Sequence, residues 1–276
     1  MTGTALVSYQ ERFEADADAL AEREARAGVA LSTQGGVFSL AGQPLGPSVY
    51  VVVLDSYYEY NFFNPNYAFQ RENPLPPMCY SFGRDKEMLA PFPGMQSDPS
   101  WFWPQNAKCD GTCPLNRWGS SSRGRGKACQ NRERLVVIPC GYLQPPVRGR
   151  GGGDVHLFED PEHYAKADAI SLRLPVTSVE NWSRYVTTLA SAHRRPPYAV
   201  FTEITIKPDP KSQFRLHFEM VDLCPEALFE TITRRVDAAL QQPFVAYTAP
   251  TAEQIQAALA PPHQQAQTAG GWGPRR

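Results

Sequence analysis

The chain has 276 residues, of which 42% are hydrophobic and 20% are charged, and its formal net charge is −1. These values are typical of a globular protein with one large domain or two small ones, and they exclude a uniformly basic nucleic-acid binder. We expect no transmembrane helix, because no run of about 18 apolar residues occurs, and no secretory signal, because a basic start and an apolar block are missing. A cytosolic location follows, in which grouped cysteines bind metal or do chemistry more often than they form disulfides.

The first half of the chain predicts one helix followed by strands. Residues 8–27 are rich in Ala, Glu and Arg and predict a surface helix capped near Ser8. Residues 37–46 predict a strand, a turn and a second strand. Residues 48–60 give the strongest strand signal, with β-branched and aromatic residues over 13 positions. The aromatic and proline-rich segments 61–82 and 91–108 predict loops.

The second half alternates strands and helices. Residues 134–140 and 169–176 predict strands, and the Gly-rich segment 144–154 predicts a mobile loop. Residues 177–195 predict a helix with Thr177 or Ser178 as its N-cap. Residues 197–221 predict a β-hairpin, 224–242 an amphipathic helix, and the segment after Pro250 a short helix candidate and a disordered end. The total of six or seven strands and three helices predicts an α+β fold that is mostly β, as a mostly antiparallel barrel or sheet with helices packed on it.

The six cysteines suggest a metal site. Cys109 and Cys113 flank a spacer that contains Gly111, so their thiolates can converge on one ion, and Cys79 and Cys129 lie on either side. Four thiolates suit structural zinc, which would order a stretch with little apolar content. The alternative is that some are free buried thiols.

The other two cysteines predict structural roles. Cys140 is the candidate substitute ligand, although its place after a Val and Ile strand favours a buried thiol. Cys224 precedes a helix and is expected to be structural. A catalytic cysteine is not expected, because the cysteine segment contains no histidine.

Positive charge is concentrated in the same segment. Between residues 115 and 150 the only acid is Glu133, against eight bases: Arg117, Arg123, Arg125, Lys127, Arg132, Arg134, Arg148 and Arg150. The flexible stretch "SSSRGRG" is typical of loops that follow phosphates. The alternative is a solvated loop without a partner. A nucleotide-hydrolysing P-loop is rejected, because Ala128 follows Lys127 where Ser or Thr is required.

Aromatic residues accompany these cations. Seven lie within 13 positions: Tyr57, Tyr58, Tyr60, Phe62, Phe63, Tyr67 and Phe69. Trp101 and Trp103 precede the cysteine pair, and Trp118 follows it. Single-strand binders stack bases on such rings for about 1–3 kcal/mol per base. The alternative is core packing on one strand face, and we expect three or four of the seven to be buried.

Several phrases resemble a family of tailed-bacteriophage proteins. They are "STQGGVFSLAGQPLG", "PLPPMCYSF", "CDGTCPLNRWGSSSRGRGKACQNRERLVV" and "PYAVFTEITIKPDPKSQFRLHFEMV", and the similarity covers roughly residues 30–245. The family resembles phage single-stranded DNA-binding proteins of the OB-fold type. The resemblance implies Cys79, Cys109, Cys113 and Cys129 as ligands of a structural Zn²⁺. The chain departs from the family in its three-residue spacer, where two is usual, and in its basic end.

Together these patterns predict a non-catalytic, zinc-stabilised single-stranded DNA-binding protein of phage replication or recombination, acting in the bacterial host cytoplasm. Predicted divisions are an N-terminal arm at 1–28, an OB-like domain at 29–247 with a zinc loop at 79–135, and a flexible tail at 248–276. Phage replication proteins and further copies of the chain are possible partners. The candidate DNA-binding residues are Tyr58, Tyr60, Phe63, Tyr67, Trp101, Trp103, Arg117, Trp118, Arg123, Arg125, Lys127, Arg132 and Arg134.

Two other classes of function are alternatives. In the first, the zinc loop is a protein-interaction module that docks on a host or phage polymerase or other replication protein, its cations meeting an acidic patch. In the second, the zinc is catalytic, which needs an open coordination position and a general base. The second is disfavoured, because all five histidines lie outside the cysteine segment and none is in an HExxH pattern.

Overall fold

The computed structural model describes residues 30–63, 76–92, 108–121, 126–144, 153–244 and 247. These fall into two compact units. Unit 1 comprises the chain up to Ser56 and residues Arg132–Pro243, and unit 2 comprises Tyr57–Asn131 and the chain from Phe244 onward. The described residues form a mixed α and β fold in which strands predominate, which confirms the predicted class.

The strands form one sheet in the order β10-β9-β4-β6-β8-β1-β2-β3, with β5 added to β4 and β7 added to β6. Strands β1 and β8 pair in parallel, whereas the β1–β2, β2–β3, β4–β5, β4–β9, β6–β7, β6–β8 and β9–β10 pairs are antiparallel. The strand bounds are β1 Ala30–Ser32, β2 Phe38–Leu40, β3 Gln43–Gly46, β4 Ser48–Phe62, β5 Cys79–Gly83, β6 Gln130–Leu143, β7 Val155–Leu157, β8 Ile170–Arg173, β9 Val200–Asp209 and β10 Gln213–Leu223.

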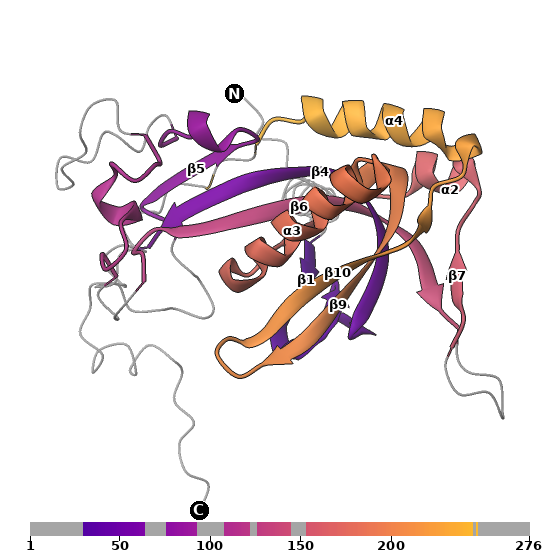
Figure 1. Ribbon diagram of the computed structural model, residues 1–276, viewed down its shortest axis with the longest axis horizontal. Helices are drawn as coiled ribbons and strands as arrows, with labels where there is room; N and C mark the ends of the chain where they lie inside the picture. Colours follow the sequence, from indigo (N-terminus) through magenta and orange to yellow (C-terminus); the bar gives the residue numbers. More distant parts are fainter. Residues whose placement is uncertain are drawn as a thin grey trace, which may run out of the picture. The chain divides into compact units, whose positions relative to one another are not determined.

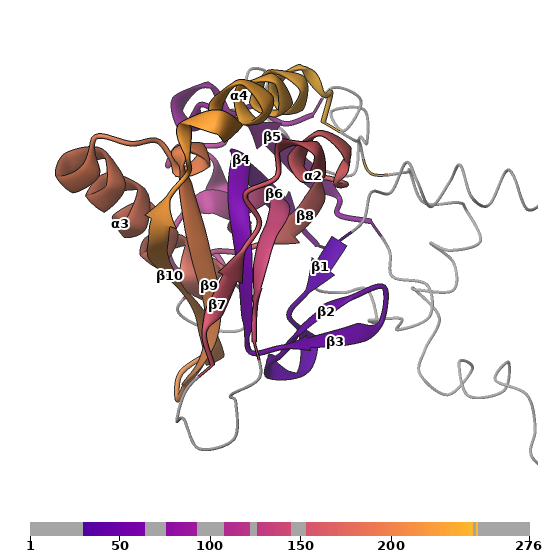
Figure 2. The same cartoon turned by 90° about the vertical axis from the view of Figure 1, so that its right-hand side faces the viewer.

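Three α-helices lie in the described part of the chain: α2 Pro161–Lys166, α3 Val179–Thr188 and α4 Glu226–Gln241. Helix α4 runs beside α2, and α3 lies beside β10 (Figures 1 and 2). The shorter helical turns are η1 Gln34–Gly36, η2 Lys86–Met88, η4 Pro114–Asn116, η5 Val176–Ser178 and η7 Pro197–Ala199, together with the π-helical turn η6 Leu189–His193.

Unit 1 has a hydrophobic core on each face of its strands. Successive residues of β4 point to opposite faces, so Val51 and Val53 join one core while Val52 and Leu54 join the other. The first core is covered by Trp182 and other residues of α3, and the second by residues of α4 and α2. Burial on both faces explains why residues 49–54 are a continuous apolar run rather than an alternating one.

The β9–β10 hairpin confirms the predicted alternation. Ile204 lies opposite Phe218, and Ile206 lies opposite Leu216, and all four side chains belong to the first core. The hairpin turn is tied by Asp209, whose carboxylate accepts hydrogen bonds from the backbone N–H and the hydroxyl of Ser212. Because a short turn joins the two strands, their pairing has a low entropic cost of loop closure. The hairpin could therefore be predicted from its local sequence.

The start of α3 differs from its expected capping. Ser178 occupies the N-cap position, as predicted, but its hydroxyl makes no capping hydrogen bond. It is fully buried and accepts instead from the backbone N–H of Leu216 at 2.9 Å. The hydroxyl therefore joins α3 to β10 rather than closing the first helical turn.

Several parts of the fold were predicted wrongly or missed, among them β1, for which no strand was predicted. Strand β5 lies where a loop was predicted, and β6 is longer than the predicted residues 134–140. Neither β7 nor α2 was predicted, although Asp160 caps α2 by accepting from the N–H of Glu162 and Pro161 follows it. The predicted helix at 8–27, most of the loop at 144–154 and the segment after Pro250 lie outside the described residues.

We predict that Gly141→Ala weakens the attachment of β7 to β6. A Cβ atom at this position would lie 2.4 Å from the carbonyl oxygen of His156, which is backbone and cannot rotate away. The expected loss is about 1–3 kcal/mol of unfolding free energy, measured by chemical denaturation. Gly111→Ala is the matched control, since nothing lies within 4 Å of its added Cβ. Equal stability of the two variants would contradict the prediction.

Candidate metal centre and cationic loop

Cys79 is placed by the pairing of β5 with the end of β4. It lies opposite Phe62, and the N–H of Met78 donates to the carbonyl of Phe62 at 2.8 Å. The side chain of Cys79 is buried, with 8% of its surface exposed. The short strand thus fixes one thiol of the predicted ligand set inside unit 2.

Cys109 and Cys113 flank a turn organised by their own spacer. The Asp110 carboxylate accepts from the N–H of Thr112 at 2.8 Å and from its hydroxyl, and the N–H of Cys113 donates to the Asp110 carbonyl at 3.3 Å. The turn continues into η4, where the N–H of Asn116 donates to the Cys113 carbonyl. Local hydrogen bonds therefore order the three-residue spacer between Cys109 and Cys113.

Asn116 connects the cysteine turn to the cationic loop. It is buried, its side-chain amide donates to the Cys109 carbonyl at 2.9 Å, and its amide oxygen accepts from the Lys127 ammonium at 3.0 Å. The N–H of Cys129 donates to the Leu115 carbonyl at 2.8 Å. One buried side chain thus positions both the 109–113 turn and the residues that precede Cys129.

Ser120 and Gly126 close the base of the cationic loop. Gly119 and Ser121 both donate backbone N–H groups to the Gly126 carbonyl, at 3.0 and 3.1 Å. The Ser120 hydroxyl accepts from the N–H of Ala128 and donates to the Arg117 carbonyl. Gly119 has φ +86°, a conformation that side chains rarely adopt, which explains the glycine in "WGSSS".

Three thiols of the predicted ligand set have raised pKa values. Burial raises the pKa of Cys109 to about 11 and that of Cys129 to about 12, and it raises the pKa of Cys79 further. At least one other cysteine of the set adds to each of these shifts, whereas the nearby Ser81 hydroxyl lowers the pKa of Cys109. Cys79, Cys109 and Cys129 are therefore protonated at neutral pH, and a metal that binds these three thiols must displace protons.

The donor set suits zinc in its chemistry, although the side chains do not stand in coordinating positions. The four soft sulfur donors come from β5, the 109–113 turn and the residue before β6. Within the described ranges, no three side chains of His, Cys, Asp or Glu form a group that could hold a metal ion as they stand. The mutual pKa effects indicate proximity, and coordination would require the thiols to turn toward a common point.

The predicted DNA-binding residues differ in their exposure and in their hydrogen bonds. Trp118 is 79% exposed beside the cysteine turn, and Arg117 is anchored by hydrogen bonds to the carbonyls of Gly111 and Thr112 at 3.3 Å. Phe63 is exposed, whereas Tyr60 is only 3% exposed and has no open ring face for a base. Tyr58, Arg132 and Arg134 are half-buried. The predicted residues outside the described part of the chain are Tyr67, Trp101, Trp103, Arg123 and Arg125.

The two remaining cysteines are buried in the second core of unit 1. Cys140 is fully buried, and Cys224 is 3% exposed. The Cys224 thiol contacts the Tyr198 carbonyl at 3.8 Å. Burial raises the pKa of both thiols, so both behave as small apolar side chains.

Sequence reasoning missed an aromatic cluster in unit 2. It combines residues of both strands of the β4–β5 pair with the segment after α4, and its rings are Tyr57, Tyr80, Phe82, Phe92, Phe244 and Tyr247. Beneath them lie two fully buried polar side chains, Glu59 and Asn61. The available signal was the "YYEYN" pattern, in which polar residues alternate with aromatic ones inside a strand.

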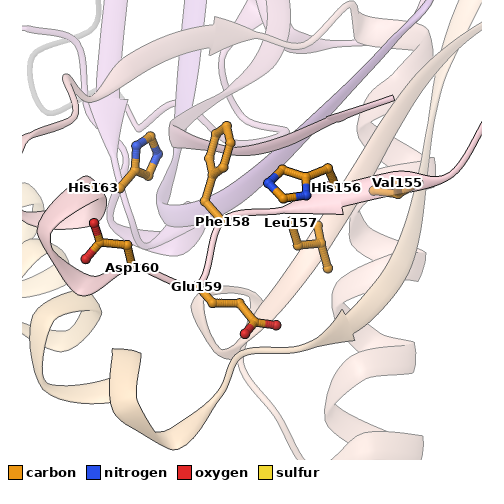
Figure 3. A pocket seen from close by; sticks show the side chains of 7 residues that line it. All are labelled: Val155, His156, Leu157, Phe158, Glu159, Asp160 and His163. Carbon is orange, nitrogen blue, oxygen red and sulfur yellow. The ribbon is translucent and has the colours of Figure 1, made fainter. Parts of the chain in front are cut away.

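Unit 1 has a surface pocket of about 680 Å³ at the end of β7 (Figure 3). Two of the polar side chains around it have structural partners. His163 Nε2 lies 2.8 Å from the Pro139 carbonyl oxygen, and the Asp160 carboxylate caps α2. No residue of the predicted site lines this pocket, whose lining is Val155, His156, Leu157, Phe158, Glu159, Asp160 and His163.

Comparison with known proteins gives no family assignment for this chain. No family model, no curated protein sequence and no solved structure matches it. Among the described residues, no helix has both the length and the apolar character needed to cross a membrane. The function must therefore be argued from the geometry of the cysteine turn and the residues around it.

Proposed function

We propose that this protein is a non-catalytic single-stranded DNA-binding protein whose cysteine loop is held by a structural Zn²⁺. The observation that carries the proposal is Trp118, a large aromatic side chain left 79% exposed on a loop tied by many hydrogen bonds. An exposed tryptophan on an ordered loop has no packing role. It suits stacking with a flat ligand, for which rigid placement lowers the entropic cost of binding.

The surroundings of Trp118 support a nucleic-acid ligand over an apolar one. Arg117 precedes it in the chain, and Lys127 lies in the same loop system through its contact with Asn116. The sequence adds Arg123 and Arg125 between them. Cations interleaved with an exposed ring are the combination that single-strand binders use to hold phosphates and bases together.

The fold proposed with this function is the OB-like antiparallel barrel or sheet implied by the family resemblance. It is supported by the mostly antiparallel strands and by the helices packed on them, and the same resemblance carries the proposed role in phage DNA replication or recombination. Zn²⁺ would be held by Cys79, Cys109, Cys113 and Cys129. Its contribution is structural, fixing the turn that presents Trp118.

The test is a fluorescence-anisotropy titration with labelled oligo-dT of about 30 nucleotides and with duplex DNA. We expect the single strand to bind and the duplex to bind much more weakly. Affinity should fall about 10- to 100-fold between about 50 and 200 mM salt, as displacement of a few counterions requires. Absence of binding to single strands would refute the function and direct attention to a protein partner of the loop.

We predict that Trp118→Ala weakens binding to oligo-dT by about 1–3 kcal/mol, the usual value of one base–ring stack. Thermal stability should be unchanged, since the ring is mostly in water. Met88→Ala is the control, because Met88 also lies in unit 2 and is 76% exposed. Equal affinities for the two variants would remove Trp118 from the binding surface.

A further inference from the structure

The segment that follows α4 packs on the aromatic side of the β4–β5 pair. The Phe244 ring lies 4.9 Å from Tyr57 and 5.8 Å from Phe82, and the Arg84 guanidinium lies over it at 5.0 Å. The Tyr247 ring lies 6.0 Å from Phe82 at an interplanar angle of 15°. Two rings of one segment are therefore stacked on rings of the sheet, with a cation covering one of them.

The hydroxyl of Tyr247 serves a buried carboxylate. It donates to Glu59, a residue with 0% of its surface exposed, and the Asn61 amide lies 3.5 Å from both. The Asn61 amide oxygen is also buried and has no hydrogen-bond partner among the described residues. A carboxylate and an unsatisfied acceptor under a layer of rings are costly to keep for packing alone.

These features match the requirements of a base-binding site. A nucleobase is a flat ring that stacks on aromatic side chains, and its edge carries N–H donors. Tyr247 supplies the same two features, a stacked ring and a donor directed at Glu59. Arg84 at the rim suits the next phosphate or the outer face of the base.

We propose that Tyr57, Tyr80, Phe82 and Arg84, with Glu59 and Asn61 at the base, form a nucleobase-binding site that Phe244 and Tyr247 occupy until single-stranded DNA displaces them. This inference rests on the proposed function. The groups left to a ligand at the base are the Glu59 carboxylate and the Asn61 amide oxygen, both acceptors, because the Asn61 N–H donates to Glu59. The site therefore takes bases with an amino group. Cytosine presents two N–H donors at its amine, whereas thymine presents one ring N–H. The site therefore prefers cytosine to thymine.

The first experiment removes the internal occupant. The Phe244→Ala/Tyr247→Ala double variant and the wild type are titrated with oligo-dC and oligo-dT of about 30 nucleotides. We expect the double variant to bind oligo-dC about tenfold more tightly, because two ring stacks no longer have to be broken. Phe229→Ala, which removes a half-exposed ring from α4, should bind like the wild type.

The second experiment tests the site without opening it. Tyr247→Phe keeps the ring and removes only the donor to Glu59, so it should fold and show a smaller gain in oligo-dC affinity. Glu59→Gln should reduce the preference for oligo-dC over oligo-dT while leaving oligo-dT affinity unchanged. A purely structural role of Glu59 would lower both affinities together.

The outcomes separate this inference from the proposed function. One outcome is that the wild type binds single strands while the double variant and Glu59→Gln both match it in affinity and base preference. In that case the inference is wrong and the proposed function stands. If neither wild type nor variants bind any single strand, both are wrong.

Discussion

Cys113→Ser is expected to abolish metal binding and to unfold the cysteine loop. The purified wild-type protein should contain one zinc per chain by elemental analysis, and the variant should contain none. Structural zinc contributes about 10–16 kcal/mol of apparent binding free energy in small sites, and the 108–121 segment has few apolar residues that could replace it. Hydrogen exchange should therefore show loss of protection at the N–H groups of Asn116 and Cys129, which are hydrogen-bonded in the folded loop.

The control for this variant is Cys224→Ala. Cys224 is also a buried cysteine, but it belongs to the second core of unit 1. Its variant should keep the zinc and lose only the stability expected for one buried sulfur atom. A wild-type protein that binds no zinc after refolding with the metal, or a Cys113→Ser protein that retains it, would contradict the assignment of these four ligands.

Trp182→Ala is expected to have the second largest effect, on the stability of unit 1. Trp182 is 2% exposed, and its ring packs against Phe218 at 5.2 Å and Tyr185 at 5.8 Å. Its removal leaves a cavity between α3 and the β9–β10 hairpin, which should cost about 3–5 kcal/mol of unfolding free energy. Chemical denaturation followed by circular dichroism measures this loss.

A comparison with Phe229→Ala makes the test specific. Phe229 is an aromatic residue on a helix as well, but 43% of its surface is exposed, so its removal should change stability by only about 0.5 kcal/mol. Similar losses for the two variants would mean that α3 is not anchored through Trp182.

Elements specified by local sequence patterns were predicted correctly, whereas elements that depend on sequence-distant contacts were missed. The β9–β10 hairpin and helix α4 were predicted correctly, because a local apolar pattern specifies each. Strand β5 was missed because its five residues follow a proline-rich segment, and only their pairing with the distant end of β4 makes them a strand. The capping prediction placed Ser178 correctly but could not anticipate its contact with Leu216 in a separate strand.

The candidate site likewise has some features that the sequence predicted and others that it did not. Spacing drew attention to the four cysteines, and the structure places their thiols near enough to affect one another's pKa. The exposure of aromatic side chains could not be predicted from the sequence. Trp118 and Tyr60 were both proposed as stacking residues, yet Trp118 is exposed to water and Tyr60 is buried. The role of Asn116 in joining the turn to Lys127 was also invisible, since a buried asparagine leaves no periodic signal.

The division of the chain has a consequence for its biosynthesis. Unit 1 contains the residues before Tyr57 and those from Arg132 to Pro243, so the whole described part of unit 2 except Phe244 and Tyr247 emerges from the ribosome before unit 1 can close. Strand β1 pairs in parallel with β8, so Ala30 cannot form its strand pairing until Ser171 has been synthesised. Such sequence-distant pairings slow folding and leave strand edges open during translation. The nascent chain is therefore expected to depend on chaperones until β8 has left the exit tunnel.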